Sequence, residues 1–256
     1  MDKKWILSIG LGSSILGIQE IYALPLSKNI DVSGSISVLS SYVYRGNTNS
    51  PENDETTFQG LIVGSYKSFY SAYFISNLGY SYRELQGGKS YSSDKYEHDF
   101  ILGYVYNYNS LVFDLSNATY YYPGGKNTTG NETIIKLTQP VDSDSISYTL
   151  ASYLFKDTIY SNKGDTFLGI NFTHNFDEKL NFEVGAGFSY FNDNGKFEGG
   201  DFLNTQKDFA FRYADAKINY QMIPNLNGYM QFILGGEDRS GVDQKNTVVM
   251  GLKYIF

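Results

Sequence analysis

The sequence predicts an all-β fold, a single transmembrane antiparallel up-and-down β-barrel of about twelve strands. Three observations support this fold class. Apolar and polar residues alternate with a period of two through most of the chain, short and long connections alternate between the strands, and the last strand is amphipathic up to its final residue. A β-sandwich has no reason to keep short and long connections alternating along its whole length, so the barrel is favoured over the sandwich.

The C-terminal strand, residues 246–256, carries the clearest single signal. One of its faces holds the apolar side chains Val248, Met250, Leu252, Tyr254 and Phe256. The last strand of a closed membrane barrel pairs with the first strand and needs an apolar outer face. Gly251, Tyr254 and Phe256, in this spacing, resemble the C-terminal signal by which bacterial outer-membrane barrels are recognised for insertion. An ordinary sheet strand that happens to be last is the simpler alternative.

The composition fits an exported barrel. The 256 residues include 24 Tyr, 18 Phe and 26 Gly but only 5 Pro. A mean hydropathy of −0.32 argues against helical membrane spans, but not against a barrel, because half of each barrel strand faces a polar interior. The chain has no Cys, so we expect stability to come from strand pairing and closure. A formal charge of −7 and a pI near 4.9 disfavour a nucleic-acid partner.

The first 23 residues have the features of a secretory signal peptide. A charged start at residues 2–4 precedes a mostly apolar run over residues 5–18, and Ala23 offers a small residue at the cut position. The apolar run is too short for a transmembrane helix. We therefore expect residues 1–23 to be removed and residues 24–256 to form the barrel.

Strand alternation predicts which side chains face lipid. Residues 180–190 give the clearest outer face, with apolar side chains at the even positions and Asn, Glu, Gly and Ser between them. In the third predicted strand we expect Tyr70, Ala72 and Phe74 to face outward. The facing of residues 58–66 stays open, because apolar residues occupy both parities there.

The connections predict which end of the barrel faces outward from the cell. Those after the even-numbered strands are short, and those after the odd-numbered strands are longer and polar, the main ones spanning residues 47–55, 84–95 and 192–206. With an even strand number, both termini and all short turns lie on one side, which we expect to be periplasmic. The apolar parity slips near Ala214, which predicts a β-bulge.

Tyrosines cluster where the predicted strands end. Those near the long loops are Tyr42, Tyr44, Tyr80, Tyr82, Tyr120, Tyr121, Tyr122 and Tyr190, and those near the short turns are Tyr66, Tyr70, Tyr106, Tyr108 and Tyr254. High β propensity explains the abundance of tyrosine but not this placement. We therefore expect two aromatic girdles at the membrane interfaces.

Three stretches carry a family resemblance. They are Ser-Ser-Tyr-Val-Tyr-Arg-Gly at 40–46, Glu-His-Asp-Phe-Ile-Leu-Gly-Tyr at 97–104 and Thr-Tyr-Tyr-Tyr-Pro-Gly at 119–124. In this order and spacing the chain resembles the TorF-type porin family, proteobacterial proteins of unknown function, over about residues 31–256. The resemblance implies an outer-membrane barrel that acts as a pore, and it brings no substrate and no functional residues with it.

The sequence predicts no catalytic, cofactor-binding or metal-binding site. A hydrolase embedded in the barrel, the enzymatic alternative, would need Ser, His and a carboxylate or amide to converge. The only histidines are His98 and His174, on strands that we expect to lie apart, and no nucleophile motif surrounds any Ser. Residues 192–195 lack the later ligands of a calcium loop.

Charged residues on the inner parity predict the lining of the lumen, because a charge at the lipid midplane costs about 2–4 kcal/mol. The pore-lining candidates are Arg45, Arg83, Asp99, Lys136, Glu183, Arg212, Asp215, Lys217 and Lys253. A ring of the three arginines near the loop side would favour anions. Alternatively, the arginines pair with the carboxylates and close the lumen with a polar network. A barrel of about twelve strands lies between small filled barrels and wide porins, so both remain open.

Fold and resemblance together imply a porin-like channel for passive diffusion of small polar or ionic solutes in the outer membrane of a Gram-negative bacterium. The expected partners are outer-membrane lipid, small polar solutes and, during biogenesis, periplasmic chaperones and the barrel-assembly machinery. Export would follow the signal peptide. A closed structural or surface-interaction barrel without pore activity is the main alternative. A soluble periplasmic β protein is another, against which the apolar face of residues 180–190 argues.

Overall fold

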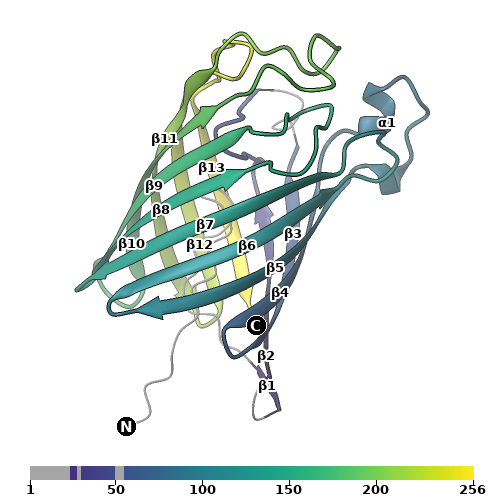
Figure 1. Ribbon diagram of the computed structural model, residues 1–256. Coiled ribbons are helices and arrows are strands. Elements are labelled where there is room, and N and C mark those ends of the chain that lie inside the picture. The colour runs from purple at the N-terminus through teal and green to yellow at the C-terminus, as the bar shows by residue number, and fades with distance from the viewer. Residues whose placement is uncertain (1–23, 28–29, 50–54) are drawn as a thin grey trace.

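The computed structural model describes residues 24–27, 30–49 and 55–256, which form a closed antiparallel β-barrel (Figure 1). The expected signal peptide, residues 1–23, lies outside the described residues, as do residues 50–54 of the first long loop. In the described ranges, no helix has the length and apolar character needed to cross a membrane.

The barrel wall consists of long strands preceded by one short strand. The strands are β1 (Leu24–Ser27), β2 (Ile30–Leu39), β3 (Thr57–Tyr66), β4 (Phe69–Asn77), β5 (Tyr96–Tyr108), β6 (Leu111–Tyr121), β7 (Gly130–Val141), β8 (Asp144–Ser152), β9 (Thr166–Asn175), β10 (Leu180–Tyr190), β11 (Phe209–Ile223), β12 (Leu226–Gly235) and β13 (Thr247–Ile255). The helical segments are α1 (Tyr82–Leu85) and η1 (Ser92–Asp94).

The ring closes through β2, which pairs with both β3 and β13. Every neighbouring pair from β2 to β13 is antiparallel, which confirms a barrel of twelve strands, while β1 pairs with the first residues of β2. The terminal Phe256 continues the seam, because its N–H and carbonyl exchange hydrogen bonds of 3.0 and 2.8 Å with the backbone of Gly34. Closure therefore leaves no open sheet edge along β13.

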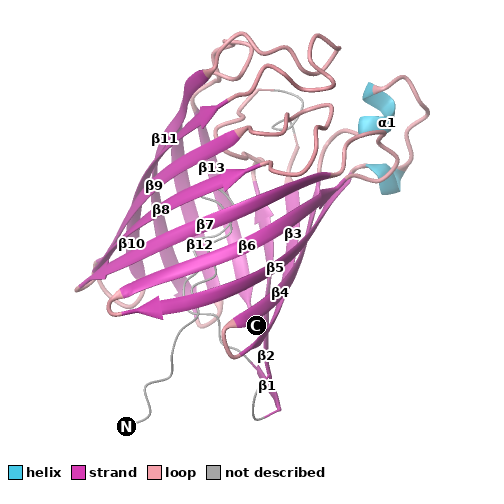
Figure 2. Ribbon diagram, in the orientation of Figure 1, coloured by secondary structure: helices cyan, strands magenta, loops and turns pink. Residues whose placement is uncertain are grey.

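Turn chemistry explains the predicted alternation of connections, which is also confirmed. Lys67, Asn109, Asp142 and Asn225 stand in the short connections with φ of 56°, 54°, 53° and 69°, the left-handed conformation that tight hairpins require. The long connections, with α1 and η1, gather at the opposite end of the barrel (Figure 2).

The outer face is apolar along most strands, as predicted. In β13 the side chains of Val248, Met250, Leu252 and Tyr254 are about half exposed, whereas Val249 between them is buried. The same alternation holds in β5, β8 and β9, where the exposed side chains include Phe100, Leu102, Tyr148, Leu150, Leu168 and Ile170. The bulge predicted near Ala214 is also present, since the β10–β11 register shifts after Gly187 and places Arg212 at the bulge between Phe211 and Tyr213.

The facing predicted for the third strand is wrong. Tyr70, Ala72 and Phe74 of β4 point into the barrel and are buried, Phe74 to 1% exposure, while Phe69 faces outward at 62%. Both faces of this strand carry apolar side chains, so alternation alone does not select the inner one. In β3, for which the sequence left the facing open, apolar side chains also point inward, because Leu61 and Val63 are buried. One side of the interior is therefore apolar.

The tyrosine girdles are confirmed only in part. Exposed tyrosines on the wall are Tyr66, Tyr96, Tyr104, Tyr106, Tyr108, Tyr121, Tyr148, Tyr190, Tyr220 and Tyr254. The expectation is wrong for Tyr42, Tyr44, Tyr70, Tyr80, Tyr82, Tyr120 and Tyr122, which are buried or half-buried. Several lie beyond the strand ends, where alternation no longer applies, and buried tyrosine hydroxyls seek polar partners. The interior at the loop end is therefore lined with tyrosine.

Candidate functional site

The barrel interior has two unlike sides. On β3 to β7 the inward side chains include an apolar cluster with Leu61, Val63, Phe74, Ile101 and Ile134. The same strands also turn charged side chains inward, namely Glu97, Asp99, Asp114, Glu132 and Lys136. On β9 to β13 the inward side chains are mainly amides and charged groups, including Asn171, Glu183, Asp215, Lys217, Asn219, Gln231 and Lys253. Charged side chains therefore face the interior from both sides, and only the stretch on β3 and β4 is largely apolar.

A turn of the β2–β3 loop narrows the loop half of the interior. Tyr44 and Asn47 bridge this turn, whose N–H(Asn47)···O(Tyr44) hydrogen bond measures 3.0 Å. Arg45 and Gly46 have φ of 48° and 80°, which aims the Arg45 side chain across the barrel toward β7.

Arg45 meets Glu132 there in a two-pronged ion pair. Arg45 Nη1 donates to Glu132 Oε1 at 2.6 Å and Nη2 donates to Oε2 at 2.9 Å. Exposure is only 7% for Arg45 and 0% for Glu132. Tyr120 adds a 2.8 Å hydrogen bond to Glu132 Oε2, and the guanidinium lies over the rings of Tyr44 and Phe167 at 4.7 and 4.4 Å. These side chains form a packed constriction.

The charge state of Arg45 follows from this setting. Burial alone would lower the pKa of Arg45, but the Glu132 carboxylate raises that pKa well above its usual range. Arg45 is therefore a permanent cation, and its charge is compensated by Glu132.

A second carboxylate group lies on β5 beside the constriction. Glu97 accepts hydrogen bonds from the hydroxyls of Tyr42 at 2.9 Å and Tyr122 at 2.8 Å. Asp99, two residues along the same inward face, is 3% exposed. Its Oδ1 accepts no hydrogen bond from any described residue.

Charges of both signs line the polar side nearer the short turns. Lys217 Nζ lies 3.8 Å from Glu183 Oε1, and Asn219 donates to the same oxygen at 2.7 Å. Asp215 Oδ2 accepts from Gln231 at 2.8 Å. The inward charges of this region thus come from three strands: Glu183 on β10, Asp215 and Lys217 on β11, and Lys253 on β13.

The outer loops are tied together above the barrel. Arg239 Nη2 donates to Asp165 Oδ2 at 2.5 Å, and its Nη1 lies 3.7 Å from Glu198 Oε1. Asn162 donates to Glu198 Oε1 at 2.6 Å. Burial raises the pKa of Asp165 although Arg239 opposes that shift. In Glu198, hydrogen bonds from Thr205 and Asn162 outweigh burial and lower the pKa.

The nine pore-lining candidates do not all lie in the lumen. Asp99, Lys136, Glu183, Asp215, Lys217 and Lys253 share the inward parity of their strands. Arg83 lies on α1 instead, where its Nε is 2.8 Å from Asp94 Oδ2. Arg212, on the bulge, bonds the carbonyl of Glu237 at 2.5 Å and the Asn47 side chain. The expected ring of three arginines is therefore absent among these residues; whether the others line a conducting path stays a prediction.

Sequence reasoning missed several interior residues for two different reasons. Glu97 and Glu132 share the inward parity of Asp99 and Lys136, so extending each strand by two or four residues would have found them. Arg239, like its partners in the loops, follows no periodic pattern, and nothing in the sequence indicates its position.

The two histidines lie apart. His98 on β5 contacts the Tyr73 hydroxyl through Nδ1 at 2.7 Å, and His174 on β9 contacts Asp144 Oδ1 at 2.6 Å. Within the described ranges, no three His, Asp or Glu side chains are grouped as metal ligands would be.

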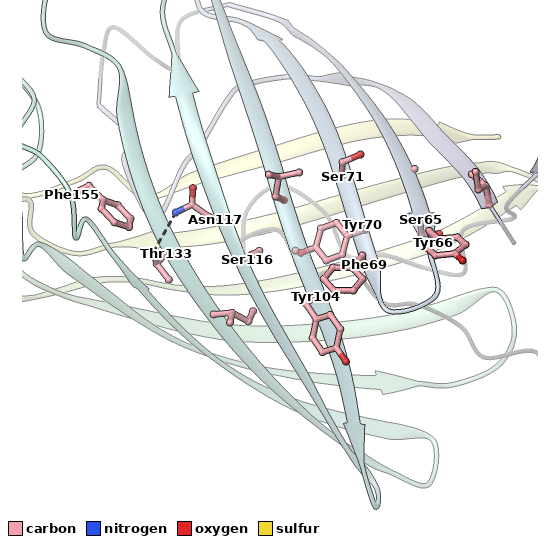
Figure 3. A pocket seen from close by; sticks show the side chains of 15 residues that line it. Ser65, Tyr66, Phe69, Tyr70, Ser71, Tyr104, Ser116, Asn117, Thr133 and Phe155 are labelled. Atoms are coloured by element: carbon pink, nitrogen blue, oxygen red, sulfur yellow. Dashed lines mark hydrogen bonds between the residues drawn. The ribbon is translucent and has the colours of Figure 1, made fainter.

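A groove of about 900 Å³ lies on the wall across β3 to β7 (Figure 3). Its lining includes the exposed rings of Tyr66, Phe69 and Tyr104, with Asn117 and Thr133 joined by a 3.3 Å hydrogen bond. These side chains share the outward parity, and the inward-facing Tyr70 and Ser116 complete the lining between the strands.

The sequence matches the model of one protein family over most of its length. The family model described as a bacterial protein of unknown function, Gcw_chp, matches residues 25–224. The chain belongs to the Gcw_chp family. This assignment agrees with the predicted membership of an uncharacterised bacterial family, while the narrower TorF-type assignment stays a prediction. No curated protein matches this Gcw_chp sequence.

Similar solved structures include porins and an outer-membrane channel. A KdgM porin is 11% identical, with a TM-score of 0.57, and the match covers 88% of the Gcw_chp chain and 99% of the porin. A NanC porin is 9% identical, with a TM-score of 0.54 and coverages of 88% and 98%. The COG4313 outer membrane channel from Pseudomonas putida F1 is 10% identical, with a TM-score of 0.50 and coverages of 97% and 99%. At these identities the likeness concerns the fold, which is that of a porin-like barrel.

Proposed function

We propose that this protein is a narrow outer-membrane channel for the passive diffusion of small polar or ionic solutes. The observation that carries the proposal is the charged inner side of β9 to β13. Glu183 and Lys217 lie 3.8 Å apart with side-chain exposures of 14% and 12%, so they retain some contact with solvent inside the barrel. Charged groups of this kind lower the energy of a hydrated solute in a low-dielectric barrel. The porin-like fold supports the same function.

Single-channel conductance in a planar bilayer tests the proposal. Purified, refolded protein should produce discrete current steps in potassium chloride. The double variant Glu183→Gln/Lys217→Met keeps the net charge of the chain and should lower the conductance, because it removes both charges from the polar side. A matched control, Glu178→Gln/Lys179→Met on the exposed β9–β10 turn, also keeps the net charge and should leave the step size unchanged.

A closed barrel is the second candidate, and the Arg45–Glu132 constriction favours it. Exposures of 7% and 0% leave little room for a solute between these side chains. A folded protein that never conducts, and that does not let small sugars swell liposomes, would establish the closed structural barrel in place of the channel.

Export and membrane insertion are part of the same proposal. Cleavage after Ala23 would release residues 24–256 into the periplasm, where chaperones and the barrel-assembly machinery would receive Gly251, Tyr254 and Phe256 as the insertion signal. Mass spectrometry of the outer-membrane fraction should find a chain beginning at residue 24. An intact N-terminus, or recovery in a soluble fraction, would contradict this route.

A further inference from the structure

The carboxylates of Glu97 and Asp99 form an acidic pair at the loop side of the interior. Both face inward from β5, and two residues of a strand separate them by about 7 Å along its axis. Exposure is 4% for Glu97 and 3% for Asp99. Burying two neighbouring carboxylates is costly unless each is paired or hydrogen-bonded.

Among the described residues, Glu97 has hydrogen-bond donors for its carboxylate, whereas Asp99 Oδ1 has none. Glu97 accepts from two tyrosine hydroxyls, at 2.8 and 2.9 Å. Asp99 Oδ1 is buried and accepts no hydrogen bond from the described residues. Native interiors rarely leave such an oxygen without a donor or an ion, so this position has room for a further donor or a cation.

The cationic side chains of this region are engaged elsewhere. Arg45 holds both oxygens of Glu132. Arg83 pairs with Asp94, and Lys95 donates to the Gly79 carbonyl at 3.3 Å. Lys136 lies six residues along β7 from the level of Asp99, about 20 Å away along the strand. The pair therefore places two carboxyl groups where no described cationic side chain lies within ion-pair distance.

Tyrosine rings enclose the region beside this pair. Tyr122 packs against Tyr82 at 4.8 Å and against Tyr160 at 5.7 Å between ring centroids. The Tyr160 hydroxyl is buried and has no hydrogen-bond partner among the described residues. Burial, and after it the neighbouring Tyr82, Glu97 and Asp99, raise the pKa of Tyr160, so this hydroxyl keeps its proton. Aromatic faces and hydroxyl oxygens both attract cations.

We infer that Glu97 and Asp99, enclosed by tyrosine, bind a small monovalent cation and make the constriction prefer cations to anions. The cation is a dehydrated alkali-metal ion or a primary ammonium group, since both need carboxylate and hydroxyl oxygens. This inference rests on the proposed channel and gives it a solute class. It replaces the anion preference expected from a ring of arginines.

Reversal potentials under a potassium chloride gradient test the preference for cations. The wild-type protein should favour potassium over chloride, and Glu97→Gln/Asp99→Asn should lower the permeability ratio by about threefold or more. Asp193→Asn/Asp201→Asn makes the same change in net charge on the exposed β10–β11 loop and should keep the wild-type ratio. Wild-type selectivity for chloride, or equal effects of both double variants, would overturn the inference while leaving the channel intact.

Binding measured without conduction separates the site from the channel. Caesium NMR with the full protein in detergent micelles should show saturable line broadening that Glu97→Gln/Asp99→Asn abolishes and the loop variant retains. Methylammonium should compete with caesium if the site accepts an ammonium group; failure to compete restricts it to metal ions. Line broadening in a protein that carries no current would refute the proposed channel but support the cation site. Absence of broadening in protein that shows the heat-dependent gel migration of a folded barrel would refute the site.

Discussion

Removing the Glu132 carboxylate should strongly destabilise the barrel. In Glu132→Ala, the guanidinium of Arg45 loses both of its 2.6 and 2.9 Å hydrogen bonds, and Tyr120 loses its 2.8 Å partner. Arg45 is only 7% exposed, so water does not readily replace them. Breaking a buried pair from one side typically costs about 3–5 kcal/mol, because it leaves a buried charge unpaired.

The double variant Arg45→Met/Glu132→Leu distinguishes an unpaired charge from lost packing. Removing both charges together should recover much of the stability, because apolar residues of similar volume often replace a buried pair at little cost. We expect a coupling free energy of about 1–3 kcal/mol in the double-mutant cycle. The free energy of unfolding is measured by urea titration of protein folded in lipid vesicles, followed by gel migration and circular dichroism.

Two results would refute this reasoning. Single variants that each change stability by less than about 0.5 kcal/mol would mean that the pair is solvated, as surface substitutions behave. Additive effects in the cycle would mean that Arg45 and Glu132 do not interact in the folded barrel. The conductance of the double variant adds an independent check, since loss of the constriction should enlarge the current steps.

Three further outcomes are expected. Deletion of Phe256 should abolish assembly into the heat-resistant form on unheated gels, because it removes both the aromatic end of the insertion signal and two backbone hydrogen bonds of the seam, whereas Phe256→Tyr should assemble normally. Gly46→Ala should lower the free energy of unfolding by about 1–3 kcal/mol more than Gly199→Ala. Both glycines have positive φ, but only at Gly46 would the new Cβ lie 2.5 Å from a backbone oxygen, that of Arg212. Equal losses in the two variants would exclude this close contact as the cause. Hydrogen bonds from the backbone N–H groups of Lys179 and Leu180 lower the pKa of Asp177 in the folded barrel. Ionised Asp177 therefore stabilises the fold fully above the unfolded pKa of about 3.9, and this stabilisation is lost as the pH falls through the folded pKa. The free energy of unfolding should depend less on acid pH in Asp177→Asn, and an unchanged pH profile would contradict this role.

Strand periodicity served well where one face of a strand is clearly apolar and the other polar. In β13 the odd-numbered Thr247, Gly251 and Lys253 point inward as predicted, since only one assignment keeps the charge out of lipid. In β4 both faces are apolar, and the inner one was assigned wrongly. On β3 and β4 both the inward and the outward side chains are largely apolar, so alternation gives no polar face by which to recognise the interior.

By itself, the sequence determined the closed all-β architecture, the twelve strands, the end at which the loops lie and the inward placement of residues such as Asp99 and Lys217. These properties follow from local chemistry, namely alternation along a strand and positive-φ residues in short turns. Only the tertiary structure decided that Arg45 reaches Glu132, 87 positions away, and that Asp99 Oδ1 meets no donor among the described residues. Such contacts depend on barrel closure, on the stagger of the strands and on a loop that folds inward. None of these produces a repeating pattern of residues in the sequence from which the contacts could be predicted.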